Sequence, residues 1–208
     1  MSFERGDHAC VIYWTREELA SAVAAFLREG LSRGEQCWYC ASDEALSDLP
    51  AALHALGTDP PSQRRGALSL IGKERLYLLD GTFDPERMIS IFNDAIEDAT
   101  ANGFTGFRVA GEMSWALDGR PGTDRLVEYE ALVGMLFATT GGTGLCLYHR
   151  DRMSPELLDA ALMTHPLAAA GAQRMSNPFY RLKPIADLHK PQPGDVAAKL
   201  KELLRRRG

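Results

Sequence analysis

The chain has 208 residues, with 23 lysines and arginines against 28 aspartates and glutamates, which gives a formal net charge of −5. This length suits one α/β domain that buries a sizeable core. Nucleic-acid binding usually needs a basic domain or stripe, so we expect no direct nucleic-acid partner. No apolar run reaches the roughly 18–20 residues that span a bilayer, and residues 1–7 contain no apolar signal segment. We therefore expect a cytoplasmic protein without a membrane partner, whose four cysteines remain thiols.

The predicted elements alternate between strand and helix along the chain. Short apolar runs predict strands at 8–14, 36–41, within 67–79, at 106–113 and at 144–148. Apolar stripes at helical spacing, opened by capping residues, predict helices at 15–33, 43–57, from 84 onward, at 124–139 and from 154 to about 165. This alternation predicts an α/β fold of three layers, in which a mostly parallel sheet carries helices on both faces.

The junction between the first predicted strand and helix reads WTREE, residues 14–18. The opening of the chain resembles RecA- and KaiC-like domains, which place G-x-x-x-x-G-K-[ST] at this turn to hold phosphates. Gly111 and Glu112 stand where such ATPases hold Mg²⁺ with Asp-[Ser/Thr]. Asp43 and Glu44 occupy the place of their catalytic carboxylates, although capping of the next helix is the simpler interpretation. The resemblance implies a RecA/KaiC-like fold, and the missing Walker A loop and lysine after Trp14 predict that the chain has no ATPase activity.

A second resemblance rests on seven short segments: GDHAC at 6–10, FLREGL at 26–31, GE at 34–35, FRVAGEMSW at 107–115, CLY at 146–148, THP at 164–166 and NPFY at 177–180. Together they resemble the MEDS family, the sensory domain of methanogen and methylotroph regulators. The resemblance covers about residues 3–182. It implies a signal-input module that senses small organic molecules beside kinase or DNA-binding output domains. The chain departs from the family pattern at His149, where an acidic residue is expected, and it carries no recognisable output domain.

Ligands of open α/β sheets bind at the carboxyl ends of the strands. We therefore predict a small-ligand pocket at the ends of the first, fourth and fifth strands. Aromatic side chains with one acidic group suit a small ligand that is partly apolar or cationic. The predicted lining residues are Trp14, Glu112, Met113, Trp115, Tyr148 and His149. A salt bridge to a nearby arginine is the competing role for Glu112. His165 and Tyr180 would form one wall, although both also lie in turn signals that favour an architectural role.

His8 and Cys10 lie on the same face of the first strand, because strand side chains alternate. The imidazole could lower the pKa of the thiol or share a metal with it, so we predict a sensing pair distinct from the pocket; simple core packing is the competing interpretation. Cys37 and Cys40 have C-x-x-C spacing, but an odd separation in a strand points their sulfurs to opposite faces. We therefore expect no metal, no disulfide between them and no cofactor.

Residues 1–183 are predicted to form the sensory domain, and 184–208 a linker followed by an amphipathic helix with a basic end. The favoured function is a non-catalytic input domain that binds a small organic ligand and acts on a kinase or transcription regulator. Two alternatives stay open: a degenerate RecA-like ATPase, and a pure protein-interaction module. Whether the chain forms a homo-oligomer is also open.

Overall fold

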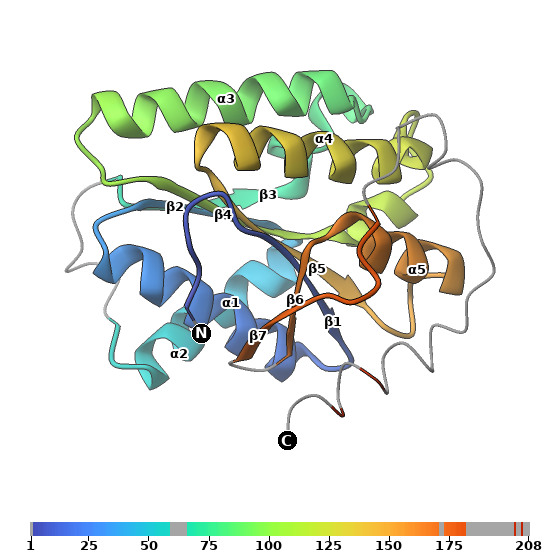
Figure 1. Ribbon diagram of the computed structural model, residues 1–208, viewed down its shortest axis with the longest axis horizontal. Helices are drawn as coiled ribbons and strands as arrows, with labels where there is room; N and C mark the ends of the chain where they lie inside the picture. Colours follow the sequence, from blue (N-terminus) through green and yellow to red (C-terminus); the bar gives the residue numbers. More distant parts are fainter. Residues whose placement is uncertain (1, 59–65, 171–172, 182–201, 203–204, 206–208) are drawn as a thin grey trace.

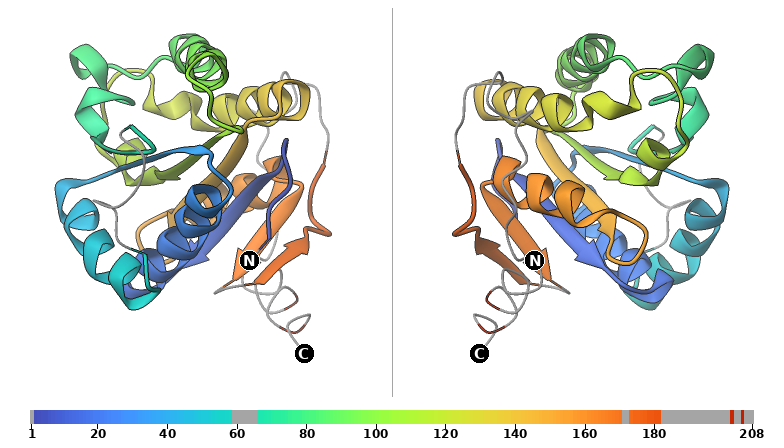
Figure 2. Two further views of the ribbon diagram at one scale, coloured as in Figure 1. Left: turned by 90° about the vertical axis from the view of Figure 1, so that its left-hand side faces the viewer. Right: turned by 90° about the vertical axis from the view of Figure 1, so that its right-hand side faces the viewer.

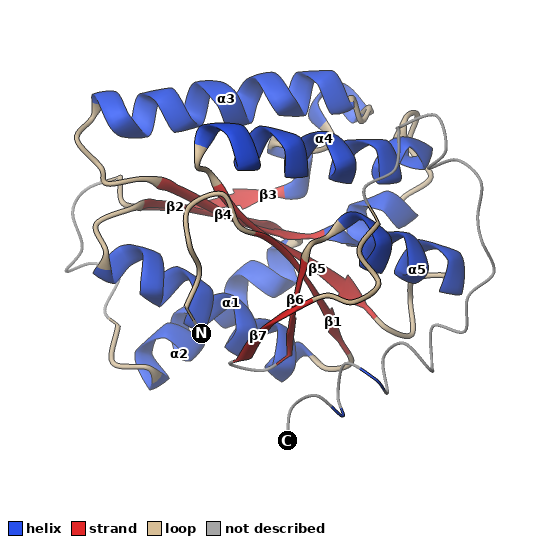
Figure 3. Cartoon of the chain, in the orientation of Figure 1, coloured by secondary structure: helices blue, strands red, loops and turns tan. Residues whose placement is uncertain are grey.

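The computed structural model describes residues 2–58, 66–170, 173–181, 202 and 205. They form one seven-stranded sheet with the order β3-β2-β4-β5-β1-β6-β7 (Figure 3). Neighbouring strands are parallel, except that β7 runs antiparallel to β6. The strands are β1 His8–Tyr13, β2 Gln36–Ala41, β3 Leu68–Gly72, β4 Phe107–Glu112, β5 Thr143–His149, β6 Leu167–Ala170 and β7 Gln173–Ser176.

Helices cover both faces of this sheet, as the alternating sequence pattern predicted. α1 and α2 lie on one face, and α3 and α4 lie on the other (Figures 1 and 2). α5 packs against α4 and β1. The helices are α1 Arg16–Ser32, α2 Asp43–Ala55, α3 Pro85–Ala101, α4 Leu126–Thr140 and α5 Pro155–Thr164, with short 3-10 turns at η2 Lys73–Arg75, η3 Leu79–Gly81, η4 Met113–Leu117 and η5 Thr123–Arg125.

Side-chain caps begin four of the five helices at the expected residues. Thr15, Ser42, Asp84 and Ser154 each accept a hydrogen bond from the backbone N–H three residues further along. These oxygens satisfy N–H groups that have no partner within the helix. The local sequence therefore sets where α1, α2, α3 and α5 start.

The sequence prediction missed β6 and β7. Neither LAAA nor QRMS is rich in the β-branched and aromatic residues that favour strands. β6 forms because it pairs with the buried β1, where Ala9 lies opposite Leu167 and Val11 opposite Ala169. Tertiary pairing thus overrides local propensity at this edge.

Two strands also end earlier than predicted. β1 stops at Tyr13 and leaves Trp14 in the turn, while β4 stops at Glu112 and Met113 opens η4. Residues 59–65 and nearly all of the predicted linker and helix at 184–208 lie outside the described residues. Within the described part of the chain, no helix has both the length and the apolar character needed to cross a membrane.

Candidate functional site

The strand order places the carboxyl ends of β1, β4 and β5 side by side, as the predicted pocket requires. Glu112 ends β4 and is buried. Its carboxylate accepts hydrogen bonds from the Tyr13 hydroxyl at 2.8 Å, the Ser114 backbone N–H at 3.1 Å and the Ser114 hydroxyl at 2.5 Å. These donors are neutral, in contrast to the arginine partner expected as the alternative. Tyr13 and Ser114 thus fix the orientation of the Glu112 carboxylate.

The other predicted lining residues differ in their exposure to solvent. Met113, Trp115 and Tyr148 are fully buried, whereas Trp14 is 39% exposed and His149 is partly exposed. The physical reason is that the chain turns into η4 directly after β4 and folds Trp115 into the core, where it stacks on Tyr77 with ring centroids 4.9 Å apart. Solvent reaches this edge of the sheet through Trp14 and His149.

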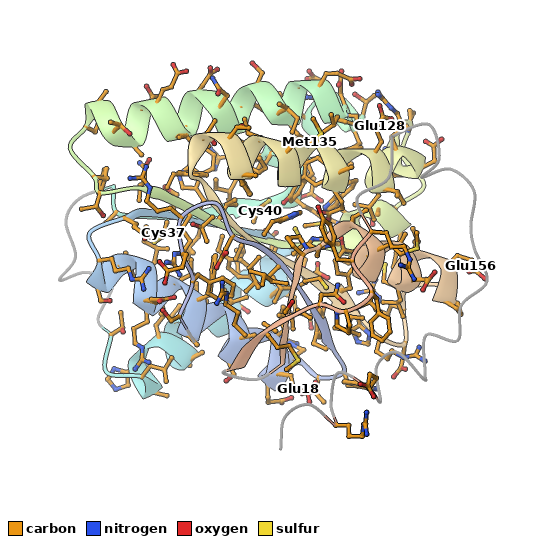
Figure 4. All side chains as sticks on the ribbon, in the orientation of Figure 1. Glu18, Cys37, Cys40, Glu128, Met135 and Glu156 are labelled. Carbon is orange, nitrogen blue, oxygen red and sulfur yellow. The ribbon has the colours of Figure 1, made fainter. Side chains whose placement is uncertain are left out.

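The turn between β1 and α1 is already capped by its own side chains. Thr15 Oγ1 accepts from the Glu18 backbone N–H at 3.2 Å, and Glu18 Oε2 accepts from the Trp14 backbone N–H at 2.8 Å. Figure 4 labels Glu18 at this end of α1. A phosphate at a helix N-terminus needs free N–H groups and compensating positive charge. This turn offers a carboxylate and an indole instead.

One surface groove, of about 590 Å³, lies between α1 and α2. Arg16 bridges its two walls: the guanidinium contacts the Asp48 carboxylate at 2.9 Å and pairs with Glu44. The groove is lined by Arg16, Glu17, Ala20, Ser21, Asp48, Ala52, Ala55 and Leu56. Glu44 is therefore engaged in a surface ion pair, while Ser42 caps α2 as expected.

A buried group of four ionisable or metal-ligating side chains lies in the core of the described structure. Its members are His8, Glu130, Cys146 and His165. Glu130 Oε2 lies 3.3 Å from His8 Nε2, 3.2 Å from His165 Nε2 and 3.3 Å from Cys146 Sγ. His8 Nε2 lies 3.4 Å from Cys146 Sγ, and the two imidazole centroids are 4.1 Å apart. We call these four residues the buried cluster.

Four elements bring the buried cluster together. His8 begins β1, Glu130 lies on α4, Cys146 lies in β5 and His165 follows α5. Two glycines leave room for the rings. A Cβ atom at residue 134 would lie 3.2 Å from His8 Nδ1, and one at residue 144 would lie 3.1 Å from His8 Cδ2 and 2.4 Å from Phe137.

Burial and the neighbouring ionisable groups together set the pKa values of this cluster. Burial, followed by the neighbouring His165, lowers the pKa of His8 to about 4 against the opposing effect of Glu130. Burial acts to raise the pKa of Glu130, but the two imidazoles outweigh it and the pKa lies well below the usual range. Burial, followed by Glu130, raises the pKa of the Cys146 thiol well above its ordinary value. Glu130 is therefore the anion of the group, and both His8 and the thiol favour their neutral forms.

The predicted sensing pair is arranged differently. His8 contacts Cys146 on the neighbouring strand, and no hydrogen bond joins it to Cys10 among the described residues. Cys10 lies opposite Cys146 in the β1–β5 register. Burial raises the pKa of Cys10 to about 12, so a reactive thiolate is disfavoured at neutral pH. Whether His8 and Cys10 sense a signal stays a prediction.

The two predicted wall residues, His165 and Tyr180, have different surroundings. His165 faces the buried cluster, whereas Tyr180 is half-buried in the turn that follows β7. Asn177 holds this turn in place by donating to the backbone carbonyls of Leu162 and His165 at 2.6 and 2.7 Å. The NPFY segment thus has an architectural part in the described structure.

Cys37 and Cys40 lie in β2 as free, buried thiols (Figure 4). Burial raises the pKa of Cys37 to about 12 and also raises the pKa of Cys40. Neither sulfur belongs to the buried cluster.

Sequence reasoning missed Glu130 altogether. It stands on the apolar stripe of α4, four residues after Leu126 and three before Val133, where both neighbours are buried. A carboxylate at that position signals a buried partner, because a lone buried charge is very costly. The three other members are separated by long stretches of sequence, so no spacing motif links them.

These observations define a RecA/KaiC-like α/β domain whose strand–helix junction carries no phosphate-binding loop. The model of the MEDS family, described as the MEthanogen/methylotroph, DcmR Sensory domain, matches residues 7–166. The chain therefore belongs to the MEDS family of sensory domains, a family with a signal-input role.

The comparison of structures agrees on the fold. The chain is similar to a KaiC-like protein from the hyperthermophilic archaeon Pyrococcus horikoshii OT3, with a TM-score of 0.57 and 13% sequence identity over 80% of this chain and 71% of that one. A search of curated protein sequences finds no match.

Proposed function

We propose that this chain is a non-catalytic signal-input domain that binds a small organic molecule and passes the binding event to a kinase or transcription regulator. The closed junction between β1 and α1 carries this proposal. Thr15 and Glu18 cap the start of α1, where a RecA-like enzyme would hold phosphates. The sensory role of the family supports the same conclusion.

The contacts at the carboxyl ends of β1, β4 and β5 support a ligand site there. Trp14 and His149 are the members that solvent reaches. Behind them, the His149 ring contacts the Tyr13 ring at 5.1 Å, and the Tyr13 hydroxyl donates to Glu112. A small ligand with a hydrogen-bond donor or a positive charge would reach Glu112 by displacing that hydroxyl. Trp14 would supply apolar contact area.

Two variants of exposed apolar residues test the location. The purified protein is screened against small organic compounds by thermal shift, and each hit is titrated by tryptophan fluorescence. Trp14→Ala should weaken binding about tenfold or more, since aromatic side chains contribute most of the contact area in such sites. Met135→Ala is the control, because Met135 is 57% exposed on the outer side of α4 (Figure 4). Equal affinity of every hit for both variants and the parent would place the site elsewhere.

Glu112→Gln tests the polar part of the same site. The amide keeps an acceptor for Tyr13 but removes the charge. Loss of a charge-assisted hydrogen bond costs about 1.5–3 kcal/mol, so binding should weaken roughly 10- to 100-fold. Unchanged affinity for donor-bearing ligands would remove Glu112 from the site.

A further inference from the structure

Four of the six separations between the ligand-type atoms of the buried cluster match the edges of a coordination tetrahedron. Bond lengths of about 2.0–2.3 Å from Zn²⁺ to nitrogen, oxygen and sulfur place neighbouring ligand atoms about 3.3–3.6 Å apart. The measured separations run from 3.2 to 3.4 Å for Glu130 Oε2 to His8, His165 and Cys146, and for His8 to Cys146. All the ligand atoms lie within 4.8 Å of one another.

The surrounding hydrogen bonds aim lone pairs into this space. His165 Nδ1 lies 2.7 Å from the Ala161 carbonyl oxygen, which can only accept, so the proton sits on Nδ1. In the neutral ring, Nε2 then turns its lone pair toward Glu130 Oε2 at 3.2 Å, and it makes no hydrogen bond among the described residues. Two facing lone pairs repel each other, and a cation between them removes the repulsion.

A second partner fixes the carboxylate. The Tyr148 hydroxyl donates a short hydrogen bond to Glu130 Oε1, which leaves Oε2 for the centre of the cluster. Metal-binding sites typically show such outer partners, in which a carbonyl orients each histidine and further hydrogen bonds hold each carboxylate. Ala161 orients His165 and Tyr148 holds Glu130 in this way, whereas Nδ1 of His8 has no hydrogen-bond partner among the described residues.

We propose that His8, Glu130, Cys146 and His165 form a tetrahedral site for one divalent transition-metal ion, Zn²⁺ foremost, in the core of the protein. Imidazole and thiolate donors favour Zn²⁺ over the hard cations Mg²⁺ and Ca²⁺. With four protein ligands no position is left for substrate or water, so the ion would stabilise the fold and not catalyse a reaction. On binding, the Cys146 S–H bond is replaced by a metal–sulfur bond and the proton leaves to solvent.

The proposed site differs from the sequence-based expectation that no metal is bound. That expectation rested on the Cys37–Cys40 pair and the His8–Cys10 pair, and it did not bring Glu130, Cys146 and His165 together with His8. The proposed site also stands independently of the proposed ligand-sensing role. The competing arrangement is a hydrogen-bonded network in which His165 is protonated beside Glu130.

Elemental analysis of the full chain, purified without chelators, decides between the two arrangements. The metal site predicts about one zinc per chain, and X-ray absorption at the zinc edge should show one sulfur and three nitrogen or oxygen neighbours. Metal-depleted protein titrated with Co²⁺ should develop the visible bands of tetrahedral cobalt and a thiolate charge-transfer band. A folded protein that takes up neither ion, and whose thermal unfolding is unchanged by chelator or added zinc, would overturn the proposal.

Two cysteine variants provide the matched comparison. Cys146→Ala should lose the thiolate charge-transfer band and weaken Co²⁺ binding by at least about 10- to 100-fold, the cost known even for outer partners of a metal. Cys40→Ala removes an equally buried thiol from β2, outside the cluster, and should keep both properties. Identical cobalt spectra from the two variants would also overturn the assignment. Should Cys146→Ala fail to fold, the absorption edge of the parent protein still reports whether sulfur is bound.

Discussion

Glu130 is the residue on which the buried cluster depends. It is an acidic side chain inside the core: Tyr148 donates to one oxygen, and two histidines and a cysteine lie 3.2–3.3 Å from the other. Burying a carboxylate is costly unless its lone pairs are used. The Tyr148 hydroxyl uses one oxygen, and the metal ion proposed above would use the other.

Tyr148→Phe should therefore destabilise the protein by about 1–3 kcal/mol, since it leaves one oxygen of a buried carboxylate without its donor. Tyr39→Phe is the matched control, because the buried Tyr39 hydroxyl has no hydrogen-bond partner among the described residues. Urea denaturation monitored by circular dichroism measures both. Equal losses in the two variants would show that the Tyr148 hydroxyl does not support Glu130.

Arg108 is a second buried charge. Like the surface arginines it pairs with carboxylates, but its own side chain is fully buried. It is fully buried in β4, and it contacts Glu35 at 2.6 Å, Glu29 at 2.9 Å and the Phe26 carbonyl at 2.9 Å. The guanidinium also lies over the Phe26 ring at 4.6 Å. These contacts tie β4 to α1 and to the start of β2.

Arg108→Ala should cost about 3–5 kcal/mol of stability, because breaking the buried pair leaves the Glu35 carboxylate uncompensated, while Glu29 keeps its pair with Arg33. Arg16→Ala also removes an arginine that pairs with two carboxylates, but on the surface, where such pairs contribute about 0–1 kcal/mol. Chemical denaturation of the two variants separates these cases. A loss below 1 kcal/mol for Arg108→Ala would mean that α1 and β4 are held together by apolar packing alone.

The loop that leads from η4 into α4 depends on one glycine. Gly122 has φ of 86°, and a Cβ atom there would lie 2.0 Å from the Phe83 carbonyl oxygen. Gly119 also has positive φ, at 64°, but nothing lies within 4 Å of its Cβ position. A substitution at Gly119 thus tests the cost of the backbone conformation alone, and one at Gly122 adds the cost of the steric contact.

Gly119→Ala should cost about 1–2 kcal/mol, the penalty of a left-handed conformation for a residue with a Cβ atom. Gly122→Ala carries the same penalty and must also move the backbone at Phe83, so its melting temperature should fall distinctly further. Differential scanning calorimetry of both variants makes the comparison. Equal melting temperatures would show that the close contact with Phe83 is relieved without cost.

At the scale of elements, most of the fold could be predicted from the sequence because the signals are local. The caps at Thr15, Ser42, Asp84 and Ser154 and the apolar run of β2 gave boundaries within a few residues of those observed. β6 and β7 could not be predicted, because they depend on pairing with β1.

The site was harder to predict for a related reason. The carboxyl ends of β1, β4 and β5 are neighbours in the sheet, but side-chain burial there depends on how η4 folds back, which no period in the sequence encodes. The buried cluster unites residues from four distant segments. The one feature of the sequence that points to this cluster is Glu130, an acidic residue on the apolar stripe of α4.

At the scale of the whole molecule, the chain combines a RecA/KaiC-like sheet with a sealed first turn and a polar cluster in its core. The family match at residues 7–166 lies within the predicted sensory domain of residues 1–183. A fold of this kind supports many functions, so the function has to be argued from the site and not from the sheet. In the proposed function, the capped turn at Thr15 and Glu18 is the feature that favours sensing over nucleotide chemistry.

Isothermal titration of the purified chain with Mg·ATP, combined with a phosphate-release assay, tests this separation most directly. The account predicts no binding heat at micromolar to millimolar nucleotide and no turnover above background, because the backbone N–H groups of Trp14 and Glu18 are already bonded within the turn, which has no glycine-rich loop or lysine for phosphates. Micromolar binding, with turnover above about 1 s⁻¹ that Glu44→Gln abolishes, would contradict it and identify the chain as an ATPase.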